Sequence, residues 1–448
     1  VSVQIQALVP SLLQPRFAAA MHRPLRCVLL LVMSSASAAR DVAALQAVLA
    51  KVAEKLHKKY DMSVAAAFYA PWAAFEVAAG YTDRGLGMGS ATRKAASEDL
   101  YVWGSTTKMF TAPAVLQLVE RGDLSLEDSV VQHVDPVLQH LGAGKTMEQH
   151  FGRDIRSVKI KHLLHMTSGI QDYDGDAYSV DQFAHRSKAF GPVEIILKYT
   201  PSQLRFAAGT KQEYCSTNYV LLGLVLLRFN HADSWEWQSY DQMSVIPEAL
   251  RQSFNESKFA MKGPCEDFTP VHGFMEAYSA AQLPPQDVSN VSCLGGWTAG
   301  NYVGSVRDVA RFTYELYSRK SQRILSAASQ TIMTDFTTSP PMPFQFYGVG
   351  TFNLAWSVGG GVEAYGHVGD TYGFQSQTTY FPSLDLVLSV ATNVETASQA
   401  QPADFTCLAY NELVATLAGT AKPHCTFTVP HKFIGTCTCH SNDEVIVV

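Results

Sequence analysis

Residues with the pattern of β-strands gather near the two ends of the chain, and helical patterns lie between them. Near the start, residues 63–69 and 73–79 are short β-prone runs around Pro71, which predicts a hairpin. Later strands are expected at residues 348–356, 364–368, 375–381 and 385–392. This order predicts an α+β fold, in which an antiparallel sheet built from distant segments is flanked by helices and carries an all-helical subdomain.

Apolar residues at helical spacing predict the helices. Asp41 is placed to cap the first helix, and Gly122 is placed to end the one that begins at Ser105. We expect this second helix to be amphipathic. The expected helices are residues 41–60, 105–120, a stretch around 162–164, 219–229, 306–317 and 405–417.

The composition is that of a folded globular protein, because 47% of the 448 residues are hydrophobic and 17% are charged. The charged residues are scattered and sum to a net charge of −6. No basic stripe interleaves with aromatic residues, which argues against nucleic acid as a partner.

The segment that begins at Met21 has the three parts of a secretory signal peptide. A basic start is followed by a short apolar run at residues 27–33 and by Ala-Ser-Ala at residues 36–38. The apolar run is too short to span a bilayer. We therefore expect residues 21–38 to be a signal peptide, residues 1–20 to be a non-native extension, and the protein to be secreted. The alternative is that the apolar run belongs to an ordinary buried helix.

Cysteines and sequons gather in a polar, proline-containing stretch at residues 235–295, which is expected to be a surface insertion. Secretion permits disulfides, and we expect one between Cys265 and Cys293. Glycosylation sequons begin at Asn255 and Asn290 in the same stretch, which favours a secreted glycoprotein.

The tail at residues 421–448 follows a folded domain that is expected over residues 39–420. Within it, Cys437, Cys439 and His440 are residue types that bind metals, but no second ligand pair lies at the spacing of a zinc site. A disulfide or a disordered tail is the favoured interpretation. The sequence implies neither a metal nor a cofactor.

Ser105 and Lys108 are the first candidates for chemistry. Three residues apart on a helix, their side chains share one face. A serine hydroxyl is a poor nucleophile until a base takes its proton, and a lysine can be that base if its surroundings lower its pKa. The pair also occurs by chance, with the serine as a helix cap and the lysine in solvent.

The surroundings of this pair are more specific than the pair itself. Residues 101–111 (Tyr-Val-Trp-Gly-Ser-Thr-Thr-Lys-Met-Phe-Thr) are followed by a turn at 122–128 and by helical segments at 160–170 and 299–312. In this order they resemble the serine β-lactamase and penicillin-binding-protein superfamily, in its branch of class C β-lactamases, DD-carboxypeptidases and esterases. The resemblance covers about residues 45–420. It implies a β-lactamase/DD-peptidase-like fold with Ser105 as the nucleophile.

Tyr214-Cys215-Ser216 resembles the family's Tyr-x-Asn loop before an apolar helix. The resemblance implies that Tyr214 is the general base, or the relay for its proton, beside Lys108. Ser216 departs from the family, whose asparagine amide binds the acyl-side amide of the substrate. A hydroxyl is shorter and offers fewer hydrogen bonds, so the substrate range is expected to differ. The alternative is a buried tyrosine with one structural partner.

His367-Val368-Gly369-Asp370 resembles the family's Lys/His-x-Gly strand beside the active site. The resemblance implies that the backbone N–H groups of Ser105 and Asp370 form the oxyanion hole. It also implies that His367 offers a polar or cationic edge to a substrate carboxylate, and that Gly369 lets a substrate backbone approach the strand. The alternative is a structural histidine.

Together the three elements imply a secreted serine hydrolase that acts through an acyl-enzyme. The expected substrates are a D-amino-acid peptide, a small ester or a β-lactam, and the sequence does not choose among them or fix the oligomeric state. One alternative is a pseudoenzyme that keeps the cleft as a binding or assembly module, which Ser216 favours. A second is a chance occurrence of the motifs in an unrelated α/β protein, which the distances among Ser105, Lys108 and Tyr214 would test.

Overall fold

The structure is a computed structural model of one chain. It describes residues 41–83, 93–229, 235–269, 271–275, 286–337, 347–359, 361–395, 401–418, 426–429, 437–440 and 445–447. The expected amino-terminal extension and signal peptide lie outside the described residues. The chain from Asp41 onward forms one compact unit.

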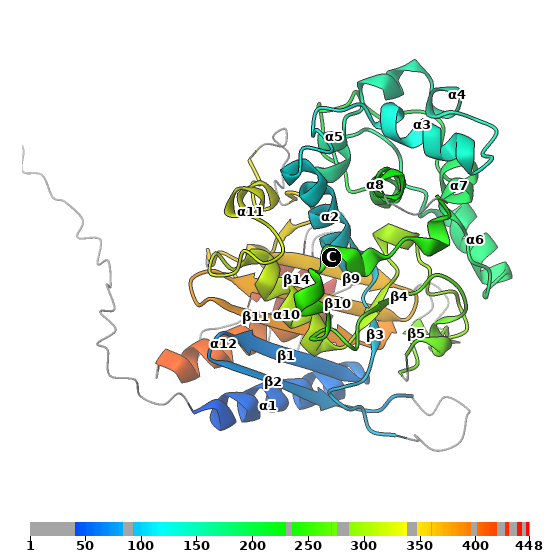
Figure 1. Ribbon diagram of the computed structural model, residues 1–448. Helices are drawn as coiled ribbons and strands as arrows, with labels where there is room; N and C mark the ends of the chain where they lie inside the picture. Colours follow the sequence, from blue (N-terminus) through cyan, green and yellow to red (C-terminus); the bar gives the residue numbers. More distant parts are fainter. Residues whose placement is uncertain are drawn as a thin grey trace, which may run out of the picture. The chain divides into compact units, whose positions relative to one another are not determined.

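A six-stranded sheet is the centre of this unit (Figure 1). β1 pairs with β11 from Val64 opposite Thr392 to Tyr69 opposite Val387, so the two ends of the domain meet inside the sheet. Neighbouring strands are antiparallel throughout. This confirms the α+β fold with a sheet assembled from distant segments. The strand order is β2 (Ala73–Ala79), β1 (Val64–Ala70), β11 (Leu386–Thr392), β10 (Phe374–Phe381), β9 (Tyr365–Thr371) and β8 (Phe352–Asn353).

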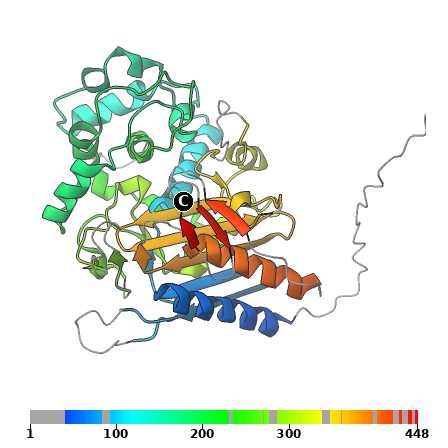
Figure 2. The ribbon, with the colours of Figure 1, turned by 180° about the vertical axis from the view of Figure 1, so that it is seen from behind.

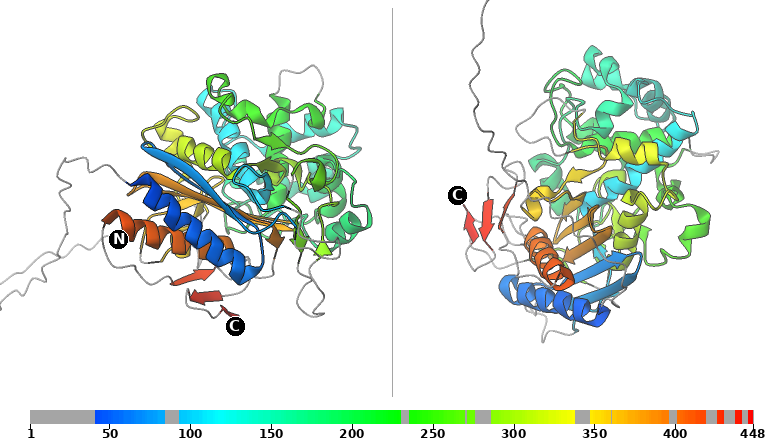
Figure 3. Two further views of the ribbon diagram at one scale, coloured as in Figure 1. Left: turned by 90° about the horizontal axis from the view of Figure 1, so that it is seen from below. Right: turned by 90° about the vertical axis from the view of Figure 1, so that its left-hand side faces the viewer.

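Helices cover both faces of the sheet. On one face, α1 (Val42–Tyr60) and α12 (Gln401–Ala418) lie side by side (Figures 2 and 3). α10 (Val306–Tyr317) packs on the other face, against β1, β10 and β11 (Figure 1). Asp41 accepts a hydrogen bond from the backbone N–H of Ala44 and so caps α1, as expected.

The helices of the middle of the chain gather beyond one end of the sheet (Figure 1). α8 is the centre of this helical subdomain, because its residues from Ser216 to Leu227 are all buried. α2, α3 and α5 pack against α8. The helices are α2 (Lys108–Glu120), α3 (Val130–His140), α4 (Met147–Phe151), α5 (Ile160–Leu164), α6 (Asp176–Ala184), α7 (Pro192–Glu194) and α8 (Ser216–Arg228), with turns η2 (Arg153–Ser157) and η3 (Ile195–Tyr199) between them.

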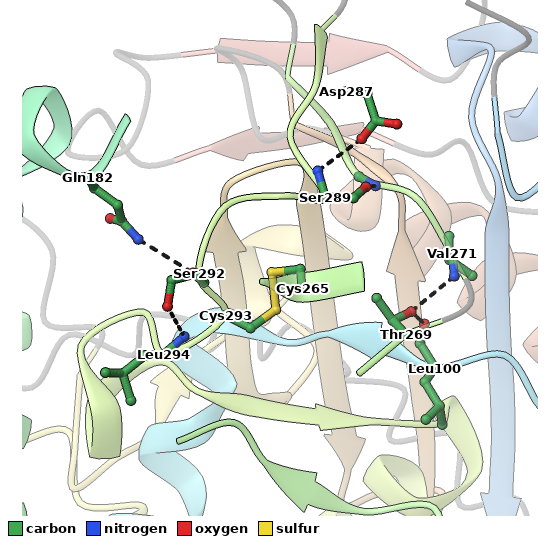
Figure 4. The surroundings of a disulfide bond; sticks show 11 residues. Leu100, Gln182, Cys265, Thr269, Val271, Asp287, Ser289, Ser292, Cys293 and Leu294 are labelled. Atoms are coloured by element: carbon green, nitrogen blue, oxygen red, sulfur yellow. Dashed lines mark hydrogen bonds between the residues drawn. A yellow bond between two sulfur atoms is a disulfide. The ribbon is translucent and has the colours of Figure 1, made fainter. Parts of the chain in front are cut away.

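Short elements connect the stretch 235–295 to its surroundings. Cys265 and Cys293 form the expected disulfide (Figure 4). Asn255 and Asn290, which begin the sequons, are both exposed. The elements here are η4 (Trp237–Ser239), η5 (Gln242–Val245), α9 (Glu248–Arg251), β4 (Lys258–Phe259), η6 (Cys265–Asp267), β5 (Phe274–Met275) and β6 (Gln286–Asp287), where β4 pairs with β7 (Tyr302–Gly304) and β5 with β12 (Val394–Glu395).

Three expectations were wrong in detail. The strand predicted over residues 348–356 is reduced to β8. Gly350 adopts a left-handed conformation (φ 58°) before it, and the chain enters the turn η8 (Ala355–Ser357) after it. The helix predicted from Ser105 begins as a tighter turn, η1 (Gly104–Thr107), before α2. α2 is also not amphipathic, since it is buried on nearly all sides.

The remaining elements complete the order. η7 (Trp297–Ala299) and η8 (Ala355–Ser357) are short turns, α11 is Ala327–Met333, and β3 (Tyr101–Val102) pairs with β7. β13 (Thr426–Val429), β14 (Cys437–His440) and β15 (Val445–Val447) form a small antiparallel sheet in the tail. In the part of the chain that the structure describes, no helix combines the length and apolarity needed to cross a membrane.

Candidate active site

Ser105 lies on η1, which packs tightly against the edge of β9. β8 pairs with β9 only at Tyr365 and Gly366, so the later part of this edge is left for η1. The contact depends on two glycines. A Cβ on Gly104 would lie 2.5 Å from the carbonyl oxygen of Asp370, and one on Gly369 would lie 1.9 Å from that of Trp103. Gly369 was expected to let a substrate backbone approach the strand, and in the structure it also makes room for Trp103, directly before η1.

Lys108 is fully buried one turn beyond Ser105. Its Nζ lies 2.8 Å from Ser105 Oγ, 3.2 Å from Ser216 Oγ and 2.9 Å from the carbonyl oxygen of Ala299. The carbonyl must accept a hydrogen bond, whereas the two hydroxyls can accept or donate. A neutral Lys108 amine can therefore donate to Ala299 and Ser216 and still accept the Ser105 proton. The same three oxygen atoms can also accept the hydrogen bonds of a protonated Lys108.

Tyr214 packs beside this pair. Lys108 Nζ lies 5.0 Å from the centre of the Tyr214 ring. Burial raises the pKa of Tyr214 well above its ordinary value, and a hydrogen bond with Ser105 opposes this only in part. The phenol therefore stays protonated at rest, a state that suits a proton relay better than a resting phenolate base.

Ser216 begins α8 and reaches the same lysine. Its backbone N–H donates to Asp172 Oδ2 at 2.8 Å. Asn218 does not take the place of the missing family asparagine. Its side chain is buried and accepts a hydrogen bond from Ser168 Oγ at 2.7 Å.

His367 lies apart from the cavity that Ser105 lines. The side chain is fully buried, with Nε2 3.2 Å from the Tyr347 hydroxyl and Nδ1 2.5 Å from the carbonyl oxygen of Val368. Burial and the charge of Lys108 lower the pKa of His367 to about 3. The imidazole is therefore neutral at physiological pH, and the expected cationic edge facing a substrate is replaced by a buried neutral ring.

A cavity of about 240 Å³ opens beside Ser105. Ser216 and Asp370 also line it, so the structure brings together these three residues that were expected at the site. Tyr372, after β9, donates a hydrogen bond to Ser179 of α6 at 3.1 Å, which connects the sheet side of the cavity to the helical side. The volume suits a small substrate or the end of a larger one.

Acidic side chains line this cavity, and sequence analysis missed most of them. They are Asp174, Asp176, Asp370 and Glu395. The alternation of Asp172, Asp174 and Asp176 directly after the family segment was a visible signal. Glu395 gave none, because its place at the cavity depends on the pairing of β12 with β5.

Two of these carboxyls have raised pKa values. Loss of hydration inside the cavity, and then the charge of Asp172, raises the pKa of Asp174, although its side chain keeps contact with solvent. Burial, and then the charge of Asp174, raises the pKa of Glu395. In the part of the chain that the structure describes, no group of three or more His, Cys, Asp or Glu side chains is arranged to hold a metal ion.

The sheet, the helical subdomain and the Ser105–Lys108 contact together define the class of serine acyl-enzyme proteins. The chain belongs to the Beta-lactamase family, whose model matches residues 49–409. It is 27% identical over 368 residues to penicillin-binding protein 4 of Amycolatopsis lactamdurans, covering 78% of this chain and 84% of that protein. This superfamily consists of serine hydrolases that act through acyl-enzymes.

Solved structures show the same fold at lower identity. A D-stereospecific amidohydrolase from Streptomyces sp. superposes with a TM-score of 0.63 at 21% identity, over 84% of this chain and 99% of that one. The D-amino acid amidase from Ochrobactrum anthropi SV3, complexed with L-phenylalanine amide, gives 0.63 at 16% identity with the same two coverages. These likenesses support the fold.

Proposed function

We propose that the protein is a secreted serine hydrolase that cleaves an amide or ester through an acyl-enzyme on Ser105. One observation carries the proposal. The Lys108 amine lies 2.8 Å from the Ser105 hydroxyl, in a fully buried position where its other contacts allow a neutral base. A chance Ser-x-x-Lys sequence with a solvated lysine does not produce this arrangement.

The reaction follows from the contacts. Lys108 takes the hydroxyl proton as Ser105 Oγ forms a bond to the substrate carbonyl carbon. Backbone N–H groups at Ser105 and Asp370 are proposed to hold the resulting oxyanion. The proton passes from Lys108, through the Tyr214 hydroxyl, to the leaving nitrogen or oxygen, and the bond to that atom breaks. Water then attacks the acyl-enzyme, gives one proton to the same groups, and releases the acid as Ser105 regains its hydrogen.

The test is covalent labelling by a fluorophosphonate, followed by intact mass. We expect one adduct on the wild type and none on Ser105→Ala. Ser179→Ala is the matched control, because this serine lines the same cavity but lies on α6. Equal labelling of wild type and Ser105→Ala would contradict the proposed nucleophile.

A binding module without turnover is the second candidate, and Ser216 favours it. The asparagine amide that would bind an acyl-side amide is absent at this position, and Asn218 is directed into the core. A folded wild type that takes no label would favour this candidate. Ser216→Asn is then the first variant to label, because it restores the missing amide.

A further inference from the structure

The cavity beside Ser105 is rich in acidic residues. The acidic residues Asp174, Asp176, Asp370 and Glu395 are among those that line it. Among the described residues that line it, there is no lysine, arginine or histidine. Lys108 lies behind Ser105 and is already engaged by three hydrogen-bond partners. Once these carboxyls are ionised, such a lining attracts cations and repels anions.

Asp174 and Glu395 face this space from different parts of the fold. Glu395, at the end of β12, accepts a hydrogen bond at 2.9 Å from the backbone N–H of Gly373, which fixes its carboxyl beside the turn between β9 and β10. Asp174 precedes α6 on the helical side. The negative charge of Asp174 makes ionisation of Glu395 less favourable, so the two groups interact. A cation between two such carboxylates relieves their repulsion.

Gln182 supplies an independent sign that a hydrogen-bond donor is missing. Its side chain is 1% exposed and lines the same cavity. The amide nitrogen donates to the carbonyl oxygen of Ser292 at 3.4 Å (Figure 4), which leaves Oε1 as the other polar atom. This buried oxygen has no hydrogen-bond partner among the described residues. A buried acceptor without a donor is unfavourable, and a ligand N–H group would satisfy it.

We propose that this cavity selects substrates that carry a protonated amine near the scissile carbonyl, with the ammonium held between Asp174 and Glu395. This inference rests on the proposed function, since it names the substrate class of the same site. A primary ammonium offers three donors and no acceptor, which matches a lining of acceptors. A substrate whose group at this place is a carboxylate, as in a β-lactam, meets repulsion instead.

The experiment compares matched substrates on the full chain. The p-nitroanilides of D- and L-alanine carry a free amine, and their N-acetyl derivatives do not. For whichever enantiomer is cleaved, we expect kcat/KM to favour the free amine by about tenfold or more. The preference for the free amine should fall to within about threefold in Glu395→Gln and in Asp174→Asn.

The variants are chosen to keep the fold. A glutamine at position 395 can still accept the Gly373 hydrogen bond through its amide oxygen. Glu363→Gln removes the same charge from an exposed position outside the cavity and should retain the full preference. Equal hydrolysis of free and acetylated substrates by the wild type overturns the inference, as does a preference that survives in both cavity variants.

Fluorophosphonate labelling of the same preparations separates the two proposals. A protein that labels at Ser105 but shows no amine preference keeps its proposed function and loses this inference. A folded protein that does not label loses both. Faster turnover of nitrocefin, an anionic β-lactam, than of any free-amine substrate also counts against the inference.

Discussion

At the scale of single residues, Lys108 is the group on which the proposed chemistry depends most. It is buried, and its hydrogen bonds to Ser105, Ser216 and Ala299 are all 3.2 Å or shorter. In its neutral form this amine can accept the Ser105 proton while it donates to Ser216 and Ala299. The position of Lys108 therefore determines how nucleophilic Ser105 can become.

Lys108→Met tests this connection, because methionine keeps much of the side-chain volume without the amine. We expect the rate of fluorophosphonate labelling to fall by roughly a thousandfold, the scale of general-base catalysis. Lys198→Met is the matched control, since Lys198 is an exposed lysine paired with Asp181. Circular dichroism of both variants checks the fold. Labelling of Lys108→Met at the wild-type rate would remove this lysine from the mechanism.

His367 gives a prediction about pH. Its pKa lies at about 3 in the folded protein, against 6.5 for the free side chain, so the unfolded chain binds a proton more readily. The neutral ring therefore contributes its full stability above pH 6.5, and this contribution is lost as the pH falls toward 3. His165, with a pKa lowered to about 4 by burial, acts in the same direction.

Urea unfolding between pH 7 and pH 4 measures this effect. We expect the free energy of unfolding of the wild type to decrease as the pH falls from 7 to 4, with His367 contributing on the order of 3 kcal/mol. His367→Gln should show a smaller decrease. Because His367 lies outside the cavity, a steeper decrease in the variant would contradict the buried neutral ring.

At the scale of elements, the contact between η1 and β9 sets the distance between Ser105 and the sheet. Gly369 permits this contact, since any Cβ there would overlap the carbonyl oxygen of Trp103. In Gly369→Ala either the strand or the nucleophile turn must move. We expect the free energy of unfolding to fall by about 3 kcal/mol and labelling of Ser105 to slow.

Gly175→Ala is the matched control for this change. A Cβ at Gly175 meets nothing within 4 Å, although this glycine also lines the cavity. Its melting temperature should stay at the wild-type value. If Gly369→Ala were as stable and as reactive as Gly175→Ala, the contact between η1 and β9 would not control the site.

Regular periodicity made several elements predictable from sequence. α10 and β2 have the expected limits. In α10 apolar residues recur with the helical period, and β2 is a run of small and β-prone residues whose buried positions alternate. The pattern failed where tertiary contacts dominate. α2 is surrounded by the fold on nearly all sides and so lacks a polar face, and Gly350 interrupts an apolar run with a left-handed turn.

The parts of the candidate site that lie in short sequence motifs could be predicted from the sequence. The Ser105–Lys108 contact and the lining positions of Ser216 and Asp370 follow from short, recognisable segments. The burial of His367, the use of Gly369 by Trp103 and the position of Glu395 depend on how distant segments pack. Sequence spacing carries no information about such contacts, so they required the structure.

At the scale of the whole molecule, exposed sequons and a disulfide support the proposal of secretion. Asn255 and Asn290 lie at the surface on the same stretch as the Cys265–Cys293 disulfide. After expression in a eukaryotic secretory pathway, we expect a mass decrease on treatment with peptide N-glycosidase F. The decrease should become smaller in Asn255→Gln or Asn290→Gln and vanish in the double variant. Secreted protein of unmodified mass would contradict the prediction of a glycoprotein.

The pairing of β1 with β11 also has a consequence for synthesis on the ribosome. Ser105 is made early, but the strand that η1 packs against ends at Thr371, and the strand that joins β1 to the rest of the sheet ends at Thr392. η1, which carries Ser105, therefore cannot pack against β9 until most of the domain has been translated. Assembly of the site is timed to the last part of translation, so a growing chain carries Ser105 for most of its synthesis without the arrangement that would activate it.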